Sequence, residues 1–182
     1  MKKIITLATI FLFFLVGCQK ESRTLDTSKL TLIEMDDLTE AQKEKLPIIY
    51  QAPSVNEGLS ALPFEMTLPE TLPFDAQPFQ SPTINDMSHD GKQLMVEFKI
   101  FSKSSSGKRI SLMITAINSD VESDPSSSEE VKLSSDVIAF YTNKSLSFHL
   151  DGVFYTVTYM NDDIPKEQHK SEIIDVANQM IE

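Results

Sequence analysis

Apolar and polar residues alternate with a period of two through the middle of the chain. From Leu94 to Ile100 and from Ile110 to Ala116, every even-numbered position is apolar. Alternation of this kind predicts β-strands that bury one face and expose the other. If both even-numbered sets share that face, the residue numbers of two directly opposed residues must add to an even number. The loop that connects the two strands then needs an odd number of residues or a bulge. We expect 104–107 to supply it, with the glycine at its end accepting positive φ.

Residues 136–159 give the most detailed prediction, because the pattern and the turn chemistry agree. Asp151-Gly152 is a strong signal for a two-residue hairpin turn, whose central positions both need positive φ. A turn at this point sets the expected pairs, which are Leu150–Val153, Phe148–Tyr155 and Leu146–Val157. All six side chains then share one face, and the residues between them face the other way. Asp90-Gly91 carries the same signal and predicts a second tight hairpin.

A short helix and a proline-rich segment precede these strands. The helix is expected from Asp36 to Lys45, with Thr39 as its cap. Pro47 ends it, because the residue before a proline avoids the helical region. Residues 47–82 contain seven of the nine prolines, which lack an amide donor, so we expect only edge strands and extended connections there. Apolar side chains would pin this segment along the outside of the core; they are Phe64, Met66, Leu68, Leu72, Phe74 and Phe79.

The last predicted element is an amphipathic helix, which Asp163 can cap and which tolerates Pro165 in its first turn. Its apolar stripe consists of Ile173, Ile174, Ala177, Met180 and Ile181. Six or seven strands make a sheet about 30 Å across, whereas one helix is only about 10–12 Å wide, so the sheet has to curl around the helix. The predicted fold is therefore α+β: a curled antiparallel β-sheet, a half-barrel-like meander, with one C-terminal helix packed on one face.

The N-terminus has a different pattern. A positive start, Met1–Lys3, precedes a short apolar run over residues 4–16. That run would make a helix of roughly 20 Å, too short for a bilayer core of about 30 Å, and the layout is typical of a secretory signal peptide. Leu15-Val16-Gly17-Cys18 looks like a bacterial lipobox. We therefore expect cleavage between Gly17 and Cys18, and a diacylglyceryl lipid on Cys18 that anchors the protein to the membrane.

These patterns divide the chain into three parts. Residues 1–17 are the expected signal peptide, residues 18–60 carry the lipidated cysteine and a tether with a short helix, and residues 61–182 form a single α+β domain. A flexible tether of about 40 residues would reach roughly 35 Å by coil scaling. It would hold the domain outside the membrane.

Several short motifs suggest a known kind of domain. They are Leu62-Pro63-Phe64, Leu68-Pro69, Leu72-Pro73, Leu150–Tyr155 and Ile173–Ala177. With the antiparallel meander, they make the chain from Leu62 to its end resemble a small domain of unknown function that recurs in envelope proteins of Bacillus-like bacteria. The resemblance covers about two thirds of the chain. It implies a lipoprotein of the cell envelope and brings no established activity.

Composition argues against several kinds of partner and site. The formal charge is −11, and it becomes −13 once Lys2 and Lys3 leave with the signal peptide. Phosphate backbones repel such a surface, so nucleic acid is not an expected partner. The acidic clusters at 36–37, 120–124 and 129–130, like Asp162-Asp163, lack the spacing and central glycine of a compact calcium loop, and we interpret them as solvated loops.

Candidate catalytic and metal-binding residues form no convincing constellation. His89, His149 and His169 have no second histidine or cysteine at ligand spacing, so we expect no metal and no cofactor. Ser147, His149 and Asp151 are the residue types of a catalytic triad, but no glycine-rich nucleophile elbow accompanies them, and solvated strand residues are the preferred interpretation. Six methionines either line an adaptable pocket or, more commonly, fill gaps in a core; they are Met66, Met87, Met95, Met113, Met160 and Met180.

Two functions stay open, and neither is enzymatic. The first is a monomeric, membrane-anchored lipoprotein on the extracytoplasmic face that binds an envelope protein or wall partner without catalysis. Its contact surface would be a sheet edge or the face away from the helix. The second is a carrier or chaperone that holds an apolar ligand, a lipid or a peptide, inside the half-barrel. A carrier needs an apolar cavity of hundreds of Å³, and a binding module needs none.

Overall fold

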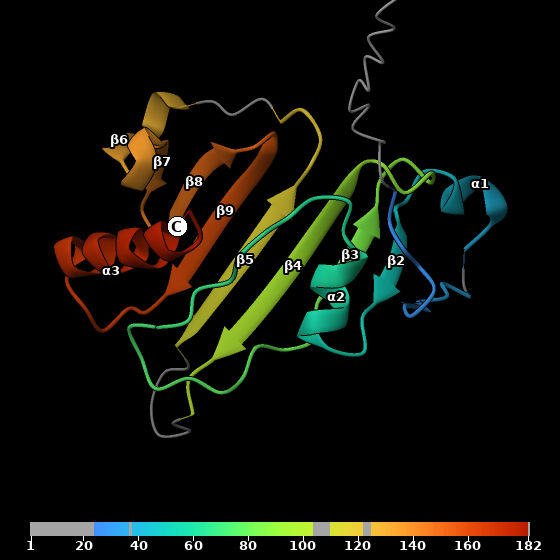
Figure 1. Ribbon diagram of the computed structural model, residues 1–182, viewed down its shortest axis with the longest axis horizontal. Coiled ribbons are helices and arrows are strands. Elements are labelled where there is room, and N and C mark those ends of the chain that lie inside the picture. The colour runs from blue at the N-terminus through green and yellow to red at the C-terminus, as the bar shows by residue number, and fades with distance from the viewer. Residues whose placement is uncertain (1–23, 37, 104–109, 122–124, 182) are drawn as a thin grey trace, which may run out of the picture.

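One antiparallel sheet of nine strands forms the body of the protein, and the C-terminal helix packs on one of its faces (Figure 1). The structure is a computed structural model that describes residues 24–36, 38–103, 110–121 and 125–181. The strands are β1 (Thr31–Leu32), β2 (Ile48–Gln51), β3 (Thr83–Asp86), β4 (Leu94–Phe101), β5 (Ser111–Ile117), β6 (Glu129–Lys132), β7 (Ile138–Thr142), β8 (Ser145–Leu150) and β9 (Val153–Met160). The helices are α1 (Glu40–Lys43), α2 (Val55–Ala61) and α3 (Lys166–Gln179), with 3₁₀ turns at Pro125–Ser127 and Ser134–Asp136.

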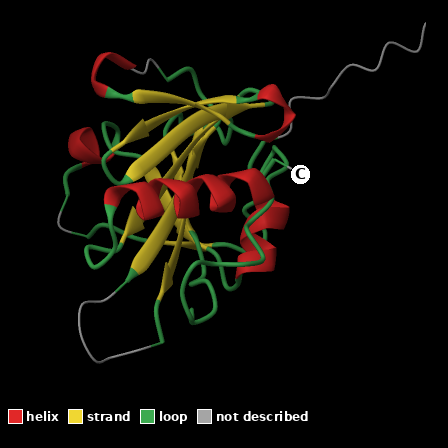
Figure 2. Ribbon diagram, turned by 90° about the vertical axis from the view of Figure 1, so that its left-hand side faces the viewer, coloured by secondary structure: helices red, strands yellow, loops and turns green. Residues whose placement is uncertain are grey.

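The sheet consists of two meanders that meet at its centre. The strand order is β1-β2-β3-β4-β5-β9-β8-β7-β6. After β5 the chain passes to the far edge, forms β6, and returns through β7 and β8 to place β9 beside β5. The sheet is open, and its strands twist strongly behind α3 (Figure 2). The predicted fold class, an α+β protein with a curled antiparallel sheet and one terminal helix on one face, is confirmed.

Both register predictions are confirmed. β8 pairs with β9 in the predicted register along the whole length of β8. The two-residue turn between them has a φ of 50° at Asp151 and 80° at Gly152. In β4 and β5 the residue numbers of each opposed pair add to an even number, as in Phe101↔Ser111. The bulge that we expect at 104–107 lies outside the described residues.

The predicted tether is wrong over most of its length, because the chain is folded from its first described residues onward. The side chain of Leu25 is buried, and its backbone N–H donates to the carbonyl of Gly91 at 2.9 Å. β1 and β2 then join the sheet, which explains why it has nine strands and not six or seven. The folded domain thus includes the described residues from 24 onward, and it does not start at residue 61. These two strands are too short to show alternation, so the pattern did not predict them.

Of the two predicted helix caps, one is confirmed and the other is wrong. α1 is capped as predicted, since Thr39 occupies its N-cap and the backbone N–H of Thr39 donates to Oε1 of Gln42 at 2.9 Å. The predicted cap of the last helix, Asp163, is wrong, because Pro165 occupies the N-cap of α3 in an extended conformation. The physical reason is that Ile164, as the residue before a proline, avoids the helical region.

A wide loop replaces the tight turn predicted at Asp90-Gly91. Residues 87–93 connect β3 to β4, and the positive φ values fall at His89 (62°) and Gly91 (72°). The buried side chain of Asp86 holds this loop open, because its Oδ2 accepts the backbone N–H of Gly91 at 2.8 Å. The β3–β4 hairpin exists as predicted, but its turn geometry does not.

Three elements cover the inner face of the sheet, which is the face that carries the core (Figure 1). α3 lies over β8 and β9, and its buried residues are His169, Ile173, Val176 and Ala177; Met180, its C-cap, is buried too. The proline-rich segment 62–82 crosses the inner face in front of β4 and β5, and α2 packs beside it. Its six predicted apolar side chains are half-buried against the core. One helix therefore does not have to cover the whole sheet.

A single side chain fastens the proline-rich segment to α3. Oε1 of Gln179 accepts the backbone N–H groups of Glu70 (3.1 Å) and Thr71 (2.9 Å). Its Nε2 donates to the carbonyl of Thr71 at 3.1 Å. These bonds join positions that are more than 100 residues apart in the sequence.

We expect Gln179→Ala to lower the free energy of unfolding by about 1–2 kcal/mol, because three bonds to main-chain groups of the proline-rich segment are lost. Gln168→Ala is the matched control, since Gln168 bonds only within α3, to Glu172 at 2.8 Å, and its loss costs about 0.5 kcal/mol or less. Urea unfolding at equal m-values measures both. Equal losses for the two variants would show that the Gln179 bonds do not stabilise the fold.

Candidate binding surfaces

The three histidines lie in separate parts of the protein. His89 is in the β3–β4 loop, where its Nε2 lies 2.7 Å from the carbonyl oxygen of Leu46. His149 is exposed on β8, with its ring centroid 4.8 Å from that of Phe154. His169 is buried in the first turn of α3. Within the described residues, no group of three His, Cys, Asp or Glu side chains is placed to hold a metal ion.

The structure does not assemble the three triad-like residues into a relay. Ser147 and His149 both point to the outer face of β8, and each contacts β9 directly across from it. Oγ of Ser147 lies 3.0 Å from Oγ1 of Thr156, and the ring of His149 packs on Phe154. Asp151 is in the β8–β9 turn, with a φ of 50°. These contacts are those of ordinary cross-strand pairs.

His169 belongs to a buried polar cluster that ties α3 to the sheet. Its Nε2 lies 2.7 Å from the carbonyl oxygen of Tyr159, and its ring stacks on that tyrosine at 4.9 Å. Its Nδ1 lies 3.2 Å from Oη of Tyr141, which donates to the carbonyl of Asn143 at 2.6 Å. Burial raises the pKa of both tyrosine hydroxyls, that of Tyr159 to about 12. The cluster therefore stays uncharged at its two phenols and positions the helix.

This cluster is not among the features predicted above, although the sequence carries a signal for it. His169 lies four residues before Ile173 and eight before Ala177, so the helical period places it on the buried stripe. Its tyrosine partners come from β7 and β9, and no local pattern predicts that these strands lie under the same turn of α3.

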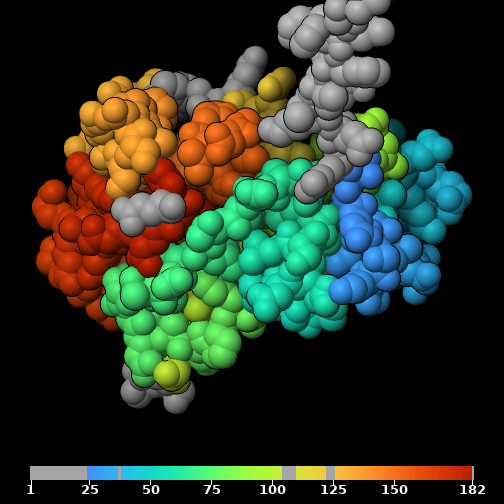
Figure 3. All heavy atoms as spheres, viewed as in Figure 1, coloured from blue at the N-terminus to red at the C-terminus, as the bar shows by residue number. Residues whose placement is uncertain are grey.

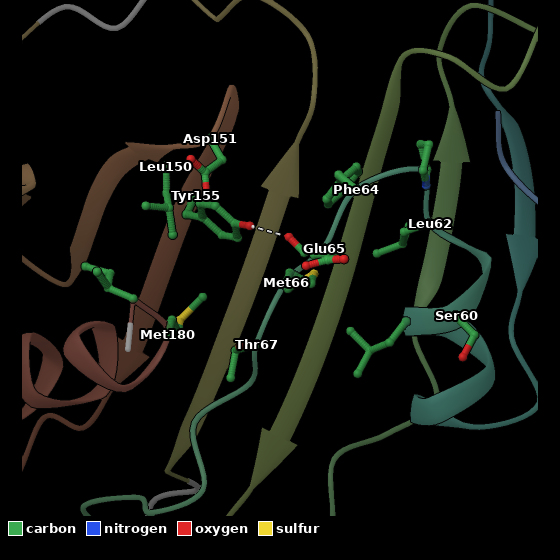
Figure 4. A pocket seen from close by; sticks show the side chains of 13 residues that line it. Ser60, Leu62, Phe64, Glu65, Met66, Thr67, Leu150, Asp151, Tyr155 and Met180 are labelled. Atoms are coloured by element: carbon green, nitrogen blue, oxygen red, sulfur yellow. Dashed lines mark hydrogen bonds between the residues drawn. The ribbon is translucent and has the colours of Figure 1, made fainter. Parts of the chain in front are cut away.

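A groove of about 600 Å³ opens on the inner face, between residues 59–67 and the end of α3 (Figure 4). Tyr155 points across it, and its hydroxyl donates to the carbonyl of Glu65 over a long 3.5 Å. Two carboxylates, those of Glu65 and Asp151, also line it. The apolar side chains that line the groove are Leu59, Leu62, Phe64, Met66, Leu150, Met180 and Ile181.

The groove is open to solvent, unlike the closed cavity that a carrier would need. Met66 and Met180 line it, and both also pack against the core. The other four methionines do neither: Met87 and Met160 are exposed, and Met95 and Met113 lie half-buried on the outer face. Their expected use as core filler is therefore wrong for these four.

The opposite face of the sheet, which we call the outer face, carries no Asp, Glu, Lys or Arg on β5, β9, β8 or β7. Its side chains are half-buried or exposed, and they are Ser111, Met113, Thr115, Ile117, Phe154, Thr156, Thr158, Met160, Ser145, Ser147, His149, Ile138, Phe140 and Thr142. Hydroxyl groups face one another across β8 and β9, as at Ser145 and Thr158, whose oxygens are 3.0 Å apart. The face thus mixes apolar and hydroxyl side chains.

This neutrality contrasts with the composition of the chain, which has 27 acidic residues and 16 basic ones. On the adjacent strand β4, the outer-face charges are Glu97 and Lys99, which pair at 2.5 Å and cancel. On the other side, the outer face of β6 carries Lys132, which pairs with Asp136, and the exposed Glu130 opposite Phe140, so the uncharged area is limited to β5, β9, β8 and β7. Depletion of charged side chains is characteristic of the centres of protein interfaces.

Comparisons with known proteins give no identity. No family model, curated protein or solved structure matches the chain. In the part of the chain that the structure describes, none of the helices has both the length and the apolar character needed to cross a membrane. The functional argument therefore depends on the surfaces described above.

We expect the free energy of unfolding to fall between pH 10 and about 12. Burial, with a smaller contribution from the carboxylate of Asp151, raises the pKa of Tyr155 to about 12. The unfolded chain releases this proton near pH 10, so the folded state binds more protons above pH 10 and loses stability as the pH rises. Tyr155→Phe should make this decrease shallower in urea titrations at pH 9, 10, 11 and 12. An unchanged slope would show that Tyr155 titrates normally.

Proposed function

We propose that this chain is a lipoprotein of the extracytoplasmic membrane face, anchored through Cys18, whose domain binds an envelope protein without catalysis. The anchor is supported by Leu15-Val16-Gly17-Cys18, which follows a short apolar run. The binding role is supported chiefly by one observation, the uncharged area of the outer face on β5, β9, β8 and β7 in an otherwise acidic protein.

The charge of the outer face indicates the chemistry of its partner. A basic partner would be drawn to the acidic surfaces and not to a neutral one. The partner surface should therefore be uncharged, with apolar and hydroxyl groups that match those of β5, β9, β8 and β7. Four strands cover roughly 500 Å², and a standard interface takes about 800 Å² from each protein. The contact should thus extend onto β4, where Glu97 and Lys99 neutralise each other.

The groove supports a second candidate function, that of a carrier for an apolar ligand. Its volume of about 600 Å³ is within the usual range for ligand sites. Its two methionines are side chains that adapt readily to different ligands. The open side of the groove argues against a carrier, because a carrier should enclose most of the ligand surface.

Replacing the lipidated residue tests the anchor. We expect Cys18→Ser to move the protein from the membrane fraction to the soluble fraction, or to leave the signal peptide uncleaved. Both are measured by fractionating cells and determining the mass of the product. Normal cleavage with unchanged membrane retention would contradict the proposed anchor.

A matched pair of lysine substitutions distinguishes the two functions. Thr156→Lys places a charge at the centre of the outer face, and Thr67→Lys places the same charge at the groove. We expect Thr156→Lys to weaken recovery of a cross-linked envelope protein about tenfold, because the charge must be desolvated in the contact, while Thr67→Lys leaves recovery unchanged. Urea unfolding checks that both variants fold. Loss with Thr67→Lys alone would favour the carrier.

A further inference from the structure

The folded chain starts very close to the proposed anchor. Besides the bond from Leu25 to Gly91, the backbone N–H of Asp26 donates to the carbonyl of Ala61 at 3.0 Å. Figure 3 shows the first described residues (blue) packed against α2 and the neighbouring edge of the sheet. The chain is therefore fixed to the domain from Leu25 onward, and its exit point is known.

This exit point limits how far the domain can lie from the bilayer. Only residues 19–23 separate Cys18 from Thr24, and six Cα-to-Cα steps span at most about 20 Å. That length is less than the width of the domain's own sheet, so the domain cannot turn freely above the membrane. With a lipid on Cys18, the surface around Gly91 would lie within about 20 Å of the bilayer.

Exposed apolar side chains gather at the same edge. Of the six large apolar residues that the structure shows as exposed, four lie at or beside β1, β2 and the β3–β4 loop: Leu32 (50%), Ile33 (40%), Leu46 (39%) and Met87 (51%). Leu46 and Met87 are close to the exit point, since Met87 shares the loop of Gly91 and the ring of His89 contacts the carbonyl of Leu46. We call Leu46 and Met87, with Leu32 and Ile33 beside them, the apolar corner.

We propose that the apolar corner inserts into the interface of the bilayer that holds Cys18, so that the domain stands at the membrane in one fixed orientation. The inference rests on the proposed lipid anchor. Leu46 and Met87 enter the headgroup region first, because they lie at or beside the loop that contacts Leu25. Apolar side chains that enter this region are stabilised by burial, and a covalent lipid supplies the remaining affinity.

Two ion pairs neutralise charge beside the corner, while the carboxylates of Glu34 and Asp36, next to Ile33, are exposed. On α1, Lys43 pairs with Glu40 at 3.2 Å, and in the loop Lys92 pairs with Asp90 at 2.8 Å, so neither element carries excess charge from these groups.

Site-specific fluorescence tests the orientation on the full lipidated protein. Cysteine replaces Leu46 or Met87 at the corner, and Ile138 or Met160 as controls, because both controls are 42% exposed and lie outside it. Each variant is labelled with an environment-sensitive nitrobenzoxadiazole dye. The protein is reconstituted into phosphatidylcholine vesicles that contain a lipid-borne quencher. The sulfur of Cys18 is blocked by its lipid and does not react.

We expect the dyes at Leu46 and Met87 to lose most of their fluorescence, with blue-shifted emission, and those at Ile138 and Met160 to be unaffected. Flotation of the vesicles shows separately whether the protein is anchored. Protein that floats without quenching at the corner, or with equal quenching at all four positions, would overturn the orientation and leave the anchor standing. Protein that does not float would overturn the anchor and the orientation together.

Discussion

The pairing of β5 with β9 is the constraint on which the other features depend. These strands are not consecutive in the sequence, yet the ladder from Ser111↔Met160 to Ile117↔Phe154 joins the two meanders into one sheet. It makes the neutral outer face continuous across β5, β9, β8 and β7. It also sets the groove in place, because residues 62–82 cover the first meander, α3 covers the second, and the groove opens where these two covers meet.

Features set by local chemistry could be predicted from the sequence. The turn at Asp151-Gly152 has both residues at positive φ, and it fixes the pairing of β8 with β9 because a two-residue loop leaves one register. Burial alone limits the register of β4 against β5 to pairs that keep the apolar sets on one face. A one-residue slip of β4 would expose Phe98. The uncharged positions of the outer face could also have been predicted, because the alternation of apolar and polar residues separates them from the core.

Features set by distant partners could not be predicted. Nothing in the sequence near Leu25 indicates that Gly91 will accept its N–H, so the first folded residues look like a polar linker. The loop 87–93 depends on a buried carboxylate, Asp86, that overrides a strong turn signal. The groove requires the ends of α3 and of α2 to lie near each other, and this depends on which strands are neighbours. Pattern analysis identifies strands but does not give their order.

The seam between β5 and β9 has a consequence for a chain that emerges from its N-terminus. The first meander carries its own cover, residues 62–82 and α2, so β1 to β5 can assemble while later residues are still being made. Until Val153–Met160 arrives, β5 is an edge strand, and its unpaired backbone groups can accept the wrong chain. The second meander stays uncovered for longer still, because α3 is synthesised last. Between the arrival of β5 and that of α3, the protein therefore exposes both a free strand edge and an uncovered half-sheet.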